Sequence, residues 1–268
     1  MRINGARVEK VTDELAEEEP LEIRVRGRGL TVTMRTPGAD DELAAGFLLT
    51  EGMIKQRADI LRIVPCPESE AGNRLDVFLA PEVYVDFEKL TRHVFASSSC
   101  GVCGKATIDA VRGAFGRVTS SATVSPLALS HMPETMRARQ ATFARTGGLH
   151  AAGLFDLQGR LLALREDVGR HNAVDKVLGF ALMQGLLPLE RHVLLVSGRL
   201  SFEIMQKALA AGVAIVAAVS APSSLAVEFA RESGQTLVGF LRGERMNVYA
   251  GVERVGERGG MKAEGERD

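Results

Sequence analysis

The stretch HVLLVSGRLSFEIMQKALAAGVAIVAAVSAPSSLAVEFARESGQTLVGFL, residues 192–241, decides the fold class of this 268-residue chain. Val193–Val196 and Val213–Val219 are continuous apolar runs, the pattern of parallel strands that are buried on both faces. Gly212 and Gly234 stand where the intervening helices are expected to end. The other segments predict helices around Phe202–Leu209 and over Ser224–Arg231, and a strand at Thr236–Leu241. This alternation predicts a layered α/β domain.

The residues before this stretch continue the alternation. They predict a helix at Pro133–Arg145, a hairpin of His150–Asp156 with Arg160–Arg165, and a helix from about Val174 to Gly185. We therefore place an α/β domain at residues 128–253. Residues 254–268 are charged and rich in glycine, so we expect a disordered tail.

The first part of the chain predicts a smaller α+β domain at residues 21–95. Its expected elements are strands at Leu21–Val25, Leu30–Met34, Arg62–Val64 and Leu75–Leu79, and a helix at Asp40–Leu49. Residues 1–20 are charged and weakly patterned, which favours a flexible lead-in. Residues 96–127 are expected to hold a mobile loop, a helix near Thr107–Phe115 and a Ser/Thr-rich connection. The whole chain therefore reads as α+β, with an α/β domain as its larger part.

Composition narrows the possible partners and location. The formal net charge is -1, so the chain offers no general attraction to nucleic acid or to an acidic membrane. An anionic ligand must be met by a local basic patch. The start of the chain lacks the apolar region of a signal peptide, and we find no apolar run long enough to span a membrane. The expected location is therefore the cytoplasm, with no membrane and no nucleic-acid partner.

Cys100 and Cys103 form a CxxC in a segment of small residues, and Cys66 is the third cysteine. A structural zinc site is improbable because no second ligand pair exists, so we expect no metal. A thioredoxin-like disulfide lacks the strand that should precede it. A sulfur-handling pair fits, because small neighbours leave the sulfurs exposed and a following helix favours thiolate. An inert CxxC is the remaining alternative.

Polar residues follow three predicted strands, at the crevice where open α/β sheets bind ligands. Backbone N–H groups and arginines there suit phosphate oxygens. The competing interpretation is that serine and asparagine cap helices while the arginines are solvated. The candidate ligand-binding residues in these loops are Arg165, Arg170, His171, Asn172, Ser197, Gly198, Arg199 and Ser220.

Six motifs taken together resemble the FdhD family, the formate dehydrogenase accessory sulfurtransferases. They are SSSCGVCGK (97–105), TGGLHAAGLFD (146–156), REDVGRHNAVDKVLG (165–179), VSGRLSFEIMQKA (196–208), VSAPSSLAVEFA (219–230) and LVGFLRGERMNVY (237–249). The resemblance extends from PLEIRVRGR near the start to Tyr249, and six long motifs in one order are far more specific than a lone CxxC.

The resemblance implies a sulfur carrier. Sulfur would come from a cysteine desulfurase, be held as a persulfide on Cys100, and pass to a molybdenum or tungsten bis(guanine dinucleotide) cofactor before its insertion into apo formate dehydrogenase. Cys103 would support transfer by receiving, relaying or reductively releasing the sulfur. The segment associated with the cofactor matches Phe240, Leu241, Arg242, Gly243, Glu244 and Arg245. GDP is the expected analogue, and a homodimer is the expected assembly.

The resemblance also implies that the larger domain is cytidine-deaminase-like. Zinc deaminases need a His-x-Glu or Cys-x-Glu and a later Pro-Cys-x-x-Cys, and those places here hold REDVGRHN and SGRLSFE, so deamination is excluded. Two other hypotheses remain: a chaperone that holds the cofactor without covalent chemistry, and a redox or metal sensor built on the CxxC. Only the carrier gains sulfur on a thiol, which mass spectrometry detects.

Overall fold

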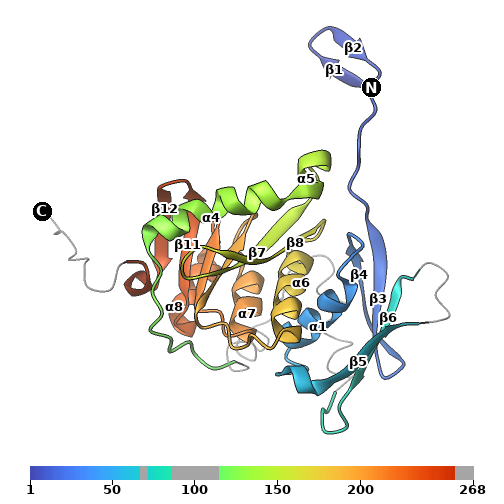
Figure 1. Cartoon of the computed structure of the whole chain (residues 1–268), viewed down its shortest axis with the longest axis vertical. Coiled ribbons are helices and arrows are strands. Elements are labelled where there is room, and N and C mark those ends of the chain that lie inside the picture. The colour runs from blue at the N-terminus through green and yellow to red at the C-terminus, as the bar shows by residue number, and fades with distance from the viewer. Residues whose placement is uncertain (67–71, 86–114, 257–268) are drawn as a thin grey trace, which may run out of the picture.

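The computed structural model describes residues 1–66, 72–85 and 115–256. Its main sheet has the strand order β12-β11-β10-β9-β7-β8 (Figure 1). The strands are β7 (His150–Asp156), β8 (Leu161–Asp167), β9 (His192–Val196), β10 (Ile215–Ala218), β11 (Thr236–Arg242) and β12 (Arg245–Ala250). β9, β10 and β11 are parallel, while β7 runs antiparallel to both β8 and β9. The carboxyl ends of β8, β9, β10 and β11 therefore meet at one edge of the sheet.

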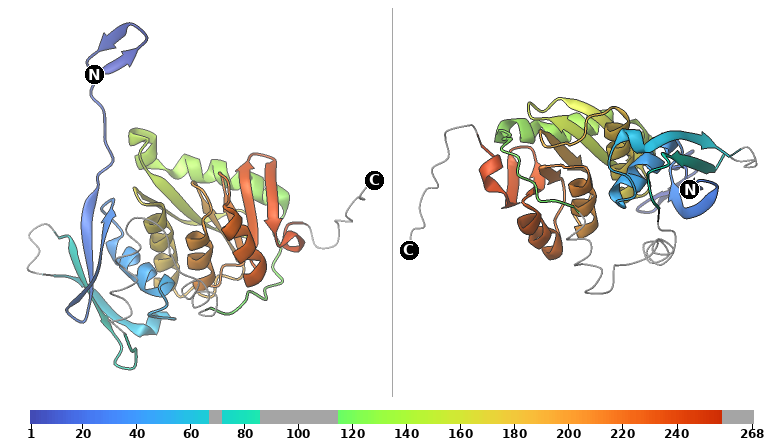
Figure 2. Two further views of the ribbon diagram at one scale, coloured as in Figure 1. Left: turned by 180° about the vertical axis from the view of Figure 1, so that it is seen from behind. Right: turned by 90° about the horizontal axis from the view of Figure 1, so that it is seen from below.

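Helices cover both faces of this sheet (Figure 2). α6 (Arg170–Met183), α7 (Phe202–Ala210) and α8 (Ser224–Ser233) lie on one face, and α4 (Pro126–Arg139) lies on the other. Side chains alternate between the faces, so Leu194 packs with the helices α6 to α8 and Leu195 packs with α4. This double burial explains the continuous apolar runs and confirms the predicted layered α/β arrangement.

The opening helix differs from the prediction of one helix over Pro133–Arg145. α4 begins seven residues earlier, where the Ser125 hydroxyl accepts a hydrogen bond from the Ala128 N–H at 3.0 Å and Pro126 occupies the first helical turn. A serine cap followed by proline is a strong start signal, and it outweighs Pro133, which lies inside the helix. The helix also breaks at Gln140, before the short α5 (Ala141–Thr146).

The smaller sheet has the order β4-β3-β6-β5. Its strands are β3 (Glu19–Val25), β4 (Arg28–Arg35), β5 (Ile60–Pro65) and β6 (Arg74–Leu79), and α1 (Asp40–Thr50) follows β4. The predicted strands and helix of this half are confirmed. A 3-10 turn, η1 (Arg57–Asp59), precedes β5. The lead-in carries an unpredicted hairpin of β1 (Arg2–Asn4) and β2 (Arg7–Glu9), which projects away from the other elements (Figure 1).

The end of the described chain is more ordered than expected. β12 was not predicted, and it pairs antiparallel with β11 at the sheet edge. The predicted disordered tail begins too early, because Arg254 is buried in η2 (Val252–Arg254) and its guanidinium donates to the Ser120 carbonyl at 2.9 Å. Val255 forms a bridge with Val124. Residues 257–268 and the predicted helix near 107–115, apart from its last residue, lie outside the described residues.

The two halves share one hydrophobic core, which includes Leu21 and Leu43 from the first half and Val177 and Leu194 from the second. α1 crosses α6 at very close range. A Cβ atom on Gly46 would lie 1.8 Å from the Asp175 carbonyl oxygen, and one on Gly179 would lie 1.8 Å from that of Glu42. Glycine is therefore required at both positions for the helices to cross at this distance.

A buried ion pair lies beside this crossing. The Lys207 ammonium on α7 donates to both carboxylate oxygens of Asp175, at 3.0 and 2.9 Å, and to the Thr50 hydroxyl at 2.9 Å. Burial lowers the pKa of Lys207, but the nearby carboxylates of Asp175 and Glu51 outweigh burial and the pKa is raised overall. The pair therefore joins three helices through one buried cation. Among the described residues, no helix is long and apolar enough to cross a membrane.

Candidate functional site

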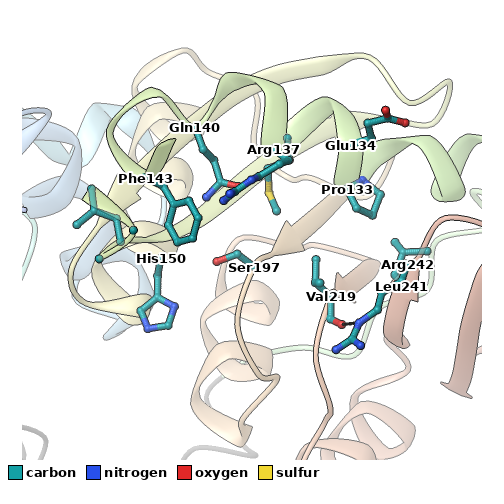
Figure 3. A pocket seen from close by; sticks show the side chains of 14 residues that line it. Pro133, Glu134, Arg137, Gln140, Phe143, His150, Ser197, Val219, Leu241 and Arg242 are labelled. Carbon is teal, nitrogen blue, oxygen red and sulfur yellow. Dashed lines mark hydrogen bonds between the residues drawn. The ribbon is translucent and has the colours of Figure 1, made fainter. Parts of the chain in front are cut away.

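A cavity of about 680 Å³ opens at the carboxyl edge of the main sheet, between the sheet and the α4–α5 corner (Figure 3). Ser197 follows β9, Val219 follows β10, and β11 ends with Leu241 and Arg242. His150 reaches the same edge because β7 runs antiparallel to β9. The remaining lining residues are Pro133, Glu134, Met136, Arg137, Gln140, Phe143, Gly147, Gly148 and Leu149. The cavity thus occupies the crevice in which α/β sheets usually bind ligands, and its volume suits a small organic molecule.

The hairpin between β11 and β12 supplies one end of the cavity. Leu241 is fully buried, while Arg242 is exposed and its Nε donates to the Val219 carbonyl at 3.2 Å. Arg245 pairs with Arg242 across the hairpin. Of the predicted segment, Leu241 and Arg242 line the cavity. Phe240, Gly243, Glu244 and Arg245 are exposed on the hairpin beside it.

Ser197 and His150 form the middle of the cavity wall. The Ser197 hydroxyl accepts a hydrogen bond from the Ala151 N–H at 2.9 Å, so it is committed to the backbone of β7. Gly198 lies against His150, since a Cβ on that glycine would be 3.4 Å from Nδ1. Burial lowers the pKa of His150, and the positive charges of Arg170 and His171 lower it further. His150 therefore favours its neutral form.

Arg170 and His171 open α6 just behind this wall. His171 Nε2 lies 2.8 Å from the Glu203 carboxylate at the start of α7. The neighbouring imidazole holds the pKa of Glu203 below its ordinary value, although burial opposes it. The pair ties the start of α6 to the start of α7, so the segments that follow β8 and β9 do come together.

The rest of the REDVGRHN motif serves another purpose. Arg165 forms a two-pronged ion pair with Glu42 of α1, at 2.5 and 2.6 Å. The Asn172 amide donates to the Met34 carbonyl at 2.8 Å, and buried Asp167 pairs with Lys176 at 2.7 Å. These side chains join the two halves of the molecule and do not line the cavity.

Two other predicted residues lie near the cavity without lining it. Arg199 is exposed in the loop after β9, and the Ser220 carbonyl accepts a hydrogen bond from the Phe240 N–H at 3.1 Å. Cys100 and Cys103 lie outside the described residues. Cys66 is half-buried and unpaired at the end of β5.

The α4–α5 corner is the part of the site that sequence analysis missed. The Arg137 guanidinium lies over the Phe143 ring, 4.0 Å from its centroid. The Glu166 carboxylate accepts hydrogen bonds from the Thr142 and Phe143 N–H groups, at 3.0 and 2.7 Å, which fixes α5 against β8. Gln140 is 4% exposed and sits at the break between the helices. No sequence signal marks this break, and the segment was predicted as one helix over Pro133–Arg145.

The lining suits an elongated anionic ligand that carries a flat, apolar part. Leu149, Leu241 and Met136 give a buried apolar floor, while Arg242 and Arg137 bring positive charge to the rim. Ser197 is the only hydroxyl among the described lining residues, and its oxygen already accepts a backbone bond. The described lining therefore offers groups that bind and orient a ligand.

Comparison with known proteins gives consistent matches along the chain. The model of the FdhD/NarQ family matches residues 16–256. The sulfur carrier protein FdhD of Streptomyces coelicolor is 53% identical over 263 residues, covering 95% of this chain and 93% of that protein. The protein of the same name from Mycobacterium tuberculosis is 54% identical over 251 residues, covering 90% and 91%. A crystal structure of a candidate formate dehydrogenase accessory protein from Desulfotalea psychrophila superposes with a TM-score of 0.72 at 28% identity, covering 91% of both chains.

Proposed function

The chain belongs to the FdhD/NarQ family, and on that premise we propose that it is a sulfur carrier for a formate dehydrogenase. It takes sulfur from a cysteine desulfurase as a persulfide on Cys100 and delivers it to a molybdenum bis(guanine dinucleotide) cofactor, its cargo. The single observation that carries this proposal is the match to sulfur carrier proteins over nearly the whole chain, within which the CxxC of this sequence lies.

The cavity at the sheet edge supports the cargo half of the proposal. A guanine dinucleotide offers a pyrophosphate, which needs charge-assisted donors, and flat rings, which need apolar or aromatic surfaces. Arg242 and the buried Leu241 provide both kinds of contact at one end of the cavity. Because the net charge of the whole chain is -1, phosphate affinity has to come from such local groups.

The CxxC supplies the sulfur chemistry of the proposal. The Cys100 thiolate attacks the outer sulfur of the desulfurase persulfide, which leaves the desulfurase thiolate and a persulfide on Cys100. If Cys103 releases the sulfur reductively, its thiolate attacks the inner sulfur of that persulfide. A Cys100–Cys103 disulfide then forms, and hydrosulfide leaves with the two electrons that the thiols supply. Relay through a persulfide on Cys103 is the alternative route.

Mass spectrometry after incubation with desulfurase and cysteine tests the carrier step. The wild type should gain the mass of one sulfur. Cys100→Ala should gain none and should fail to activate the client. Cys66→Ala is the matched control, which should both gain the sulfur and activate the client. Cys103→Ala should load sulfur but release it poorly. Sulfur loading that persists in Cys100→Ala would exclude this cysteine. No loading in any variant, with GDP binding intact, would favour a chaperone that holds the cofactor without covalent chemistry.

The architecture of the larger half accords with the cytidine-deaminase-like layer that the sequence resemblance implies. We propose that this layer serves here as a binding platform. The loops that would carry a deaminase's zinc ligands hold instead the Arg165–Glu42 ion pair and the His171–Glu203 pair. The proposed assembly is a homodimer, which sedimentation of the full chain would test.

A further inference from the structure

Gln140 lines the cavity, and its carboxamide forms no hydrogen bond with the described part of the chain. The residue is 4% exposed, and neither amide atom is among the buried side-chain atoms that lack a partner, so the carboxamide is open to the cavity. The backbone of the residue is satisfied, since its N–H donates to the Arg137 carbonyl and its carbonyl accepts from Ala144. A ligand in the cavity can therefore reach both the N–H group and the oxygen of this amide.

The side chains around Gln140 indicate what kind of ligand the cavity would bind. Figure 3 shows its carboxamide directed from the α4–α5 corner toward the cavity, beside Phe143 and Arg137, with Arg242 at the opposite end and Ser197 between. The Phe143 ring and the Arg137 guanidinium are flat groups on which a base can stack. One end of the cavity therefore has the Gln140 amide beside two flat groups, and the opposite end has the Arg242 guanidinium.

We propose that Gln140 reads the edge of a guanine base, with the phosphates extending toward Arg242. This inference rests on the function proposed above and adds the residue that pairs with the edge of the base. A carboxamide presents one donor and one acceptor side by side. Guanine presents the complementary pair, because O6 accepts from the amide N–H while N1–H donates to the amide oxygen. Ser197 and Arg137 offer no such pair, since a hydroxyl carries its donor and acceptor on one atom and Arg137 has no acceptor.

Calorimetric titration of the full chain tests the assignment with GDP, O6-methyl-GDP and inorganic pyrophosphate. Methylation at O6 removes N1–H and blocks the O6 acceptor without touching the phosphates. The wild type should prefer GDP over O6-methyl-GDP by about tenfold to a hundredfold, the effect of losing two hydrogen bonds to a buried amide. Gln140→Leu should bind GDP more weakly by the same factor and should discriminate less than threefold between the two nucleotides.

Two controls separate base reading from a structural role. Gln158→Leu, in the exposed turn between β7 and β8, should leave every affinity unchanged. Pyrophosphate should bind the wild type and Gln140→Leu equally, because a collapsed cavity would weaken that probe as well. If Gln140→Leu keeps the full preference for GDP, the assignment is wrong while the proposed function stands. If neither GDP nor pyrophosphate binds the wild type, the proposed cargo site itself fails.

Discussion

At the scale of single residues, two charged side chains should respond differently to substitution: Lys207 in the core should affect stability, and Arg242 at the cavity rim should affect binding. Lys207 is buried between α1, α6 and α7, and its ammonium is paired on Asp175. Arg242 is exposed at the cavity rim, with its Nε on the Val219 carbonyl. Breaking the buried pair leaves a carboxylate in the core, whereas removing the rim charge leaves only solvent. The two residues therefore separate effects on stability from effects on binding.

Lys207→Met should lower the free energy of unfolding by about 3–5 kcal/mol, because Asp175 is left buried without its partner. Adding Asp175→Leu to that variant should recover much of the loss, since the uncompensated charge is then gone. Urea unfolding followed by circular dichroism measures both values. Lys55→Met, on the exposed surface, is the matched control. A double variant no more stable than Lys207→Met would show that the pair is not the origin of the cost.

Arg242→Ala combined with Arg245→Ala should weaken GDP binding and flatten its dependence on salt concentration. Two fewer cations near the phosphates mean less charge-assisted hydrogen bonding and a smaller screened attraction. Calorimetry at two salt concentrations gives the comparison, and unfolding should be nearly unchanged because both side chains are exposed. Equal affinity in the two proteins would move the phosphate site elsewhere.

His150 should make stability depend on pH below its ordinary pKa of 6.5. Burial, Arg170 and His171 lower the pKa of His150 in the folded chain, so the unfolded chain binds the proton first. Stability is therefore fully retained above 6.5 and is lost as the pH falls toward the folded pKa. His150→Gln should flatten this loss, as measured by urea unfolding at several pH values. A variant at the exposed His131 gives the comparison, and parallel curves for the wild type and His150→Gln would refute the assignment.

At the scale of elements, the crossing of α1 and α6 depends on two glycines. Gly179→Ala should destabilise the chain by more than about 2 kcal/mol even though alanine favours helix, because its Cβ would lie 1.8 Å from the Glu42 carbonyl oxygen. Gly116→Ala is the matched control, since a Cβ there meets open space. Chemical unfolding of both variants decides the matter, and a Gly179→Ala midpoint equal to the wild type would contradict the tight crossing.

The elements that sequence could predict are those whose periodicity matches their burial. Val193–Val196 and Val213–Val219 are buried on both faces, so their apolar runs predict strands without ambiguity. β12 (Arg245–Ala250) was missed because it is a short edge strand in which every residue except Ala250 is exposed or half-buried, although Met246, Val248 and Ala250 do alternate along it. The start of α4 was missed because the prediction began the helix at Pro133 and did not use the serine cap and proline at Ser125 and Pro126.

The residues of the candidate site also divide into those that the sequence could predict and those that it could not. Ser197, Leu241 and Arg242 follow predicted strands, and topology alone carries them to one edge. Gln140 and Phe143 could not be found from sequence, because their helix reaches the cavity only through tertiary packing. The REDVGRHN segment at the end of β8 and the start of α6 shows the reverse error. Its polar residues resemble ligand contacts, and yet Arg165 and Asn172 hold the small half in place.

At the scale of the whole molecule, one shared core joins the two halves, whereas the N-terminal hairpin stands apart from it (Figure 1). Deletion of residues 1–12 should therefore change the free energy of unfolding by less than about 0.5 kcal/mol, because the removed side chains are almost all exposed. Deletion of residues 1–18 should cost more, since it also removes the Glu14–Arg145 ion pair. Thermal unfolding of the three proteins gives the ranking, and a large loss from the shorter deletion would show that the hairpin supports the fold.

Polar residues at the end of β8 and the start of α6 hold the two halves together although they resemble ligand contacts, and this changes how a mutational scan of the protein should be scored. Substitutions at Asp167 or Asn172 would reduce growth by lowering the amount of folded protein, although neither side chain lines the cavity. Scored by growth alone, such positions would be mistaken for ligand contacts. Scans that report abundance beside growth would separate them from Gln140 and Arg242, whose replacement should spare abundance and lower growth alone.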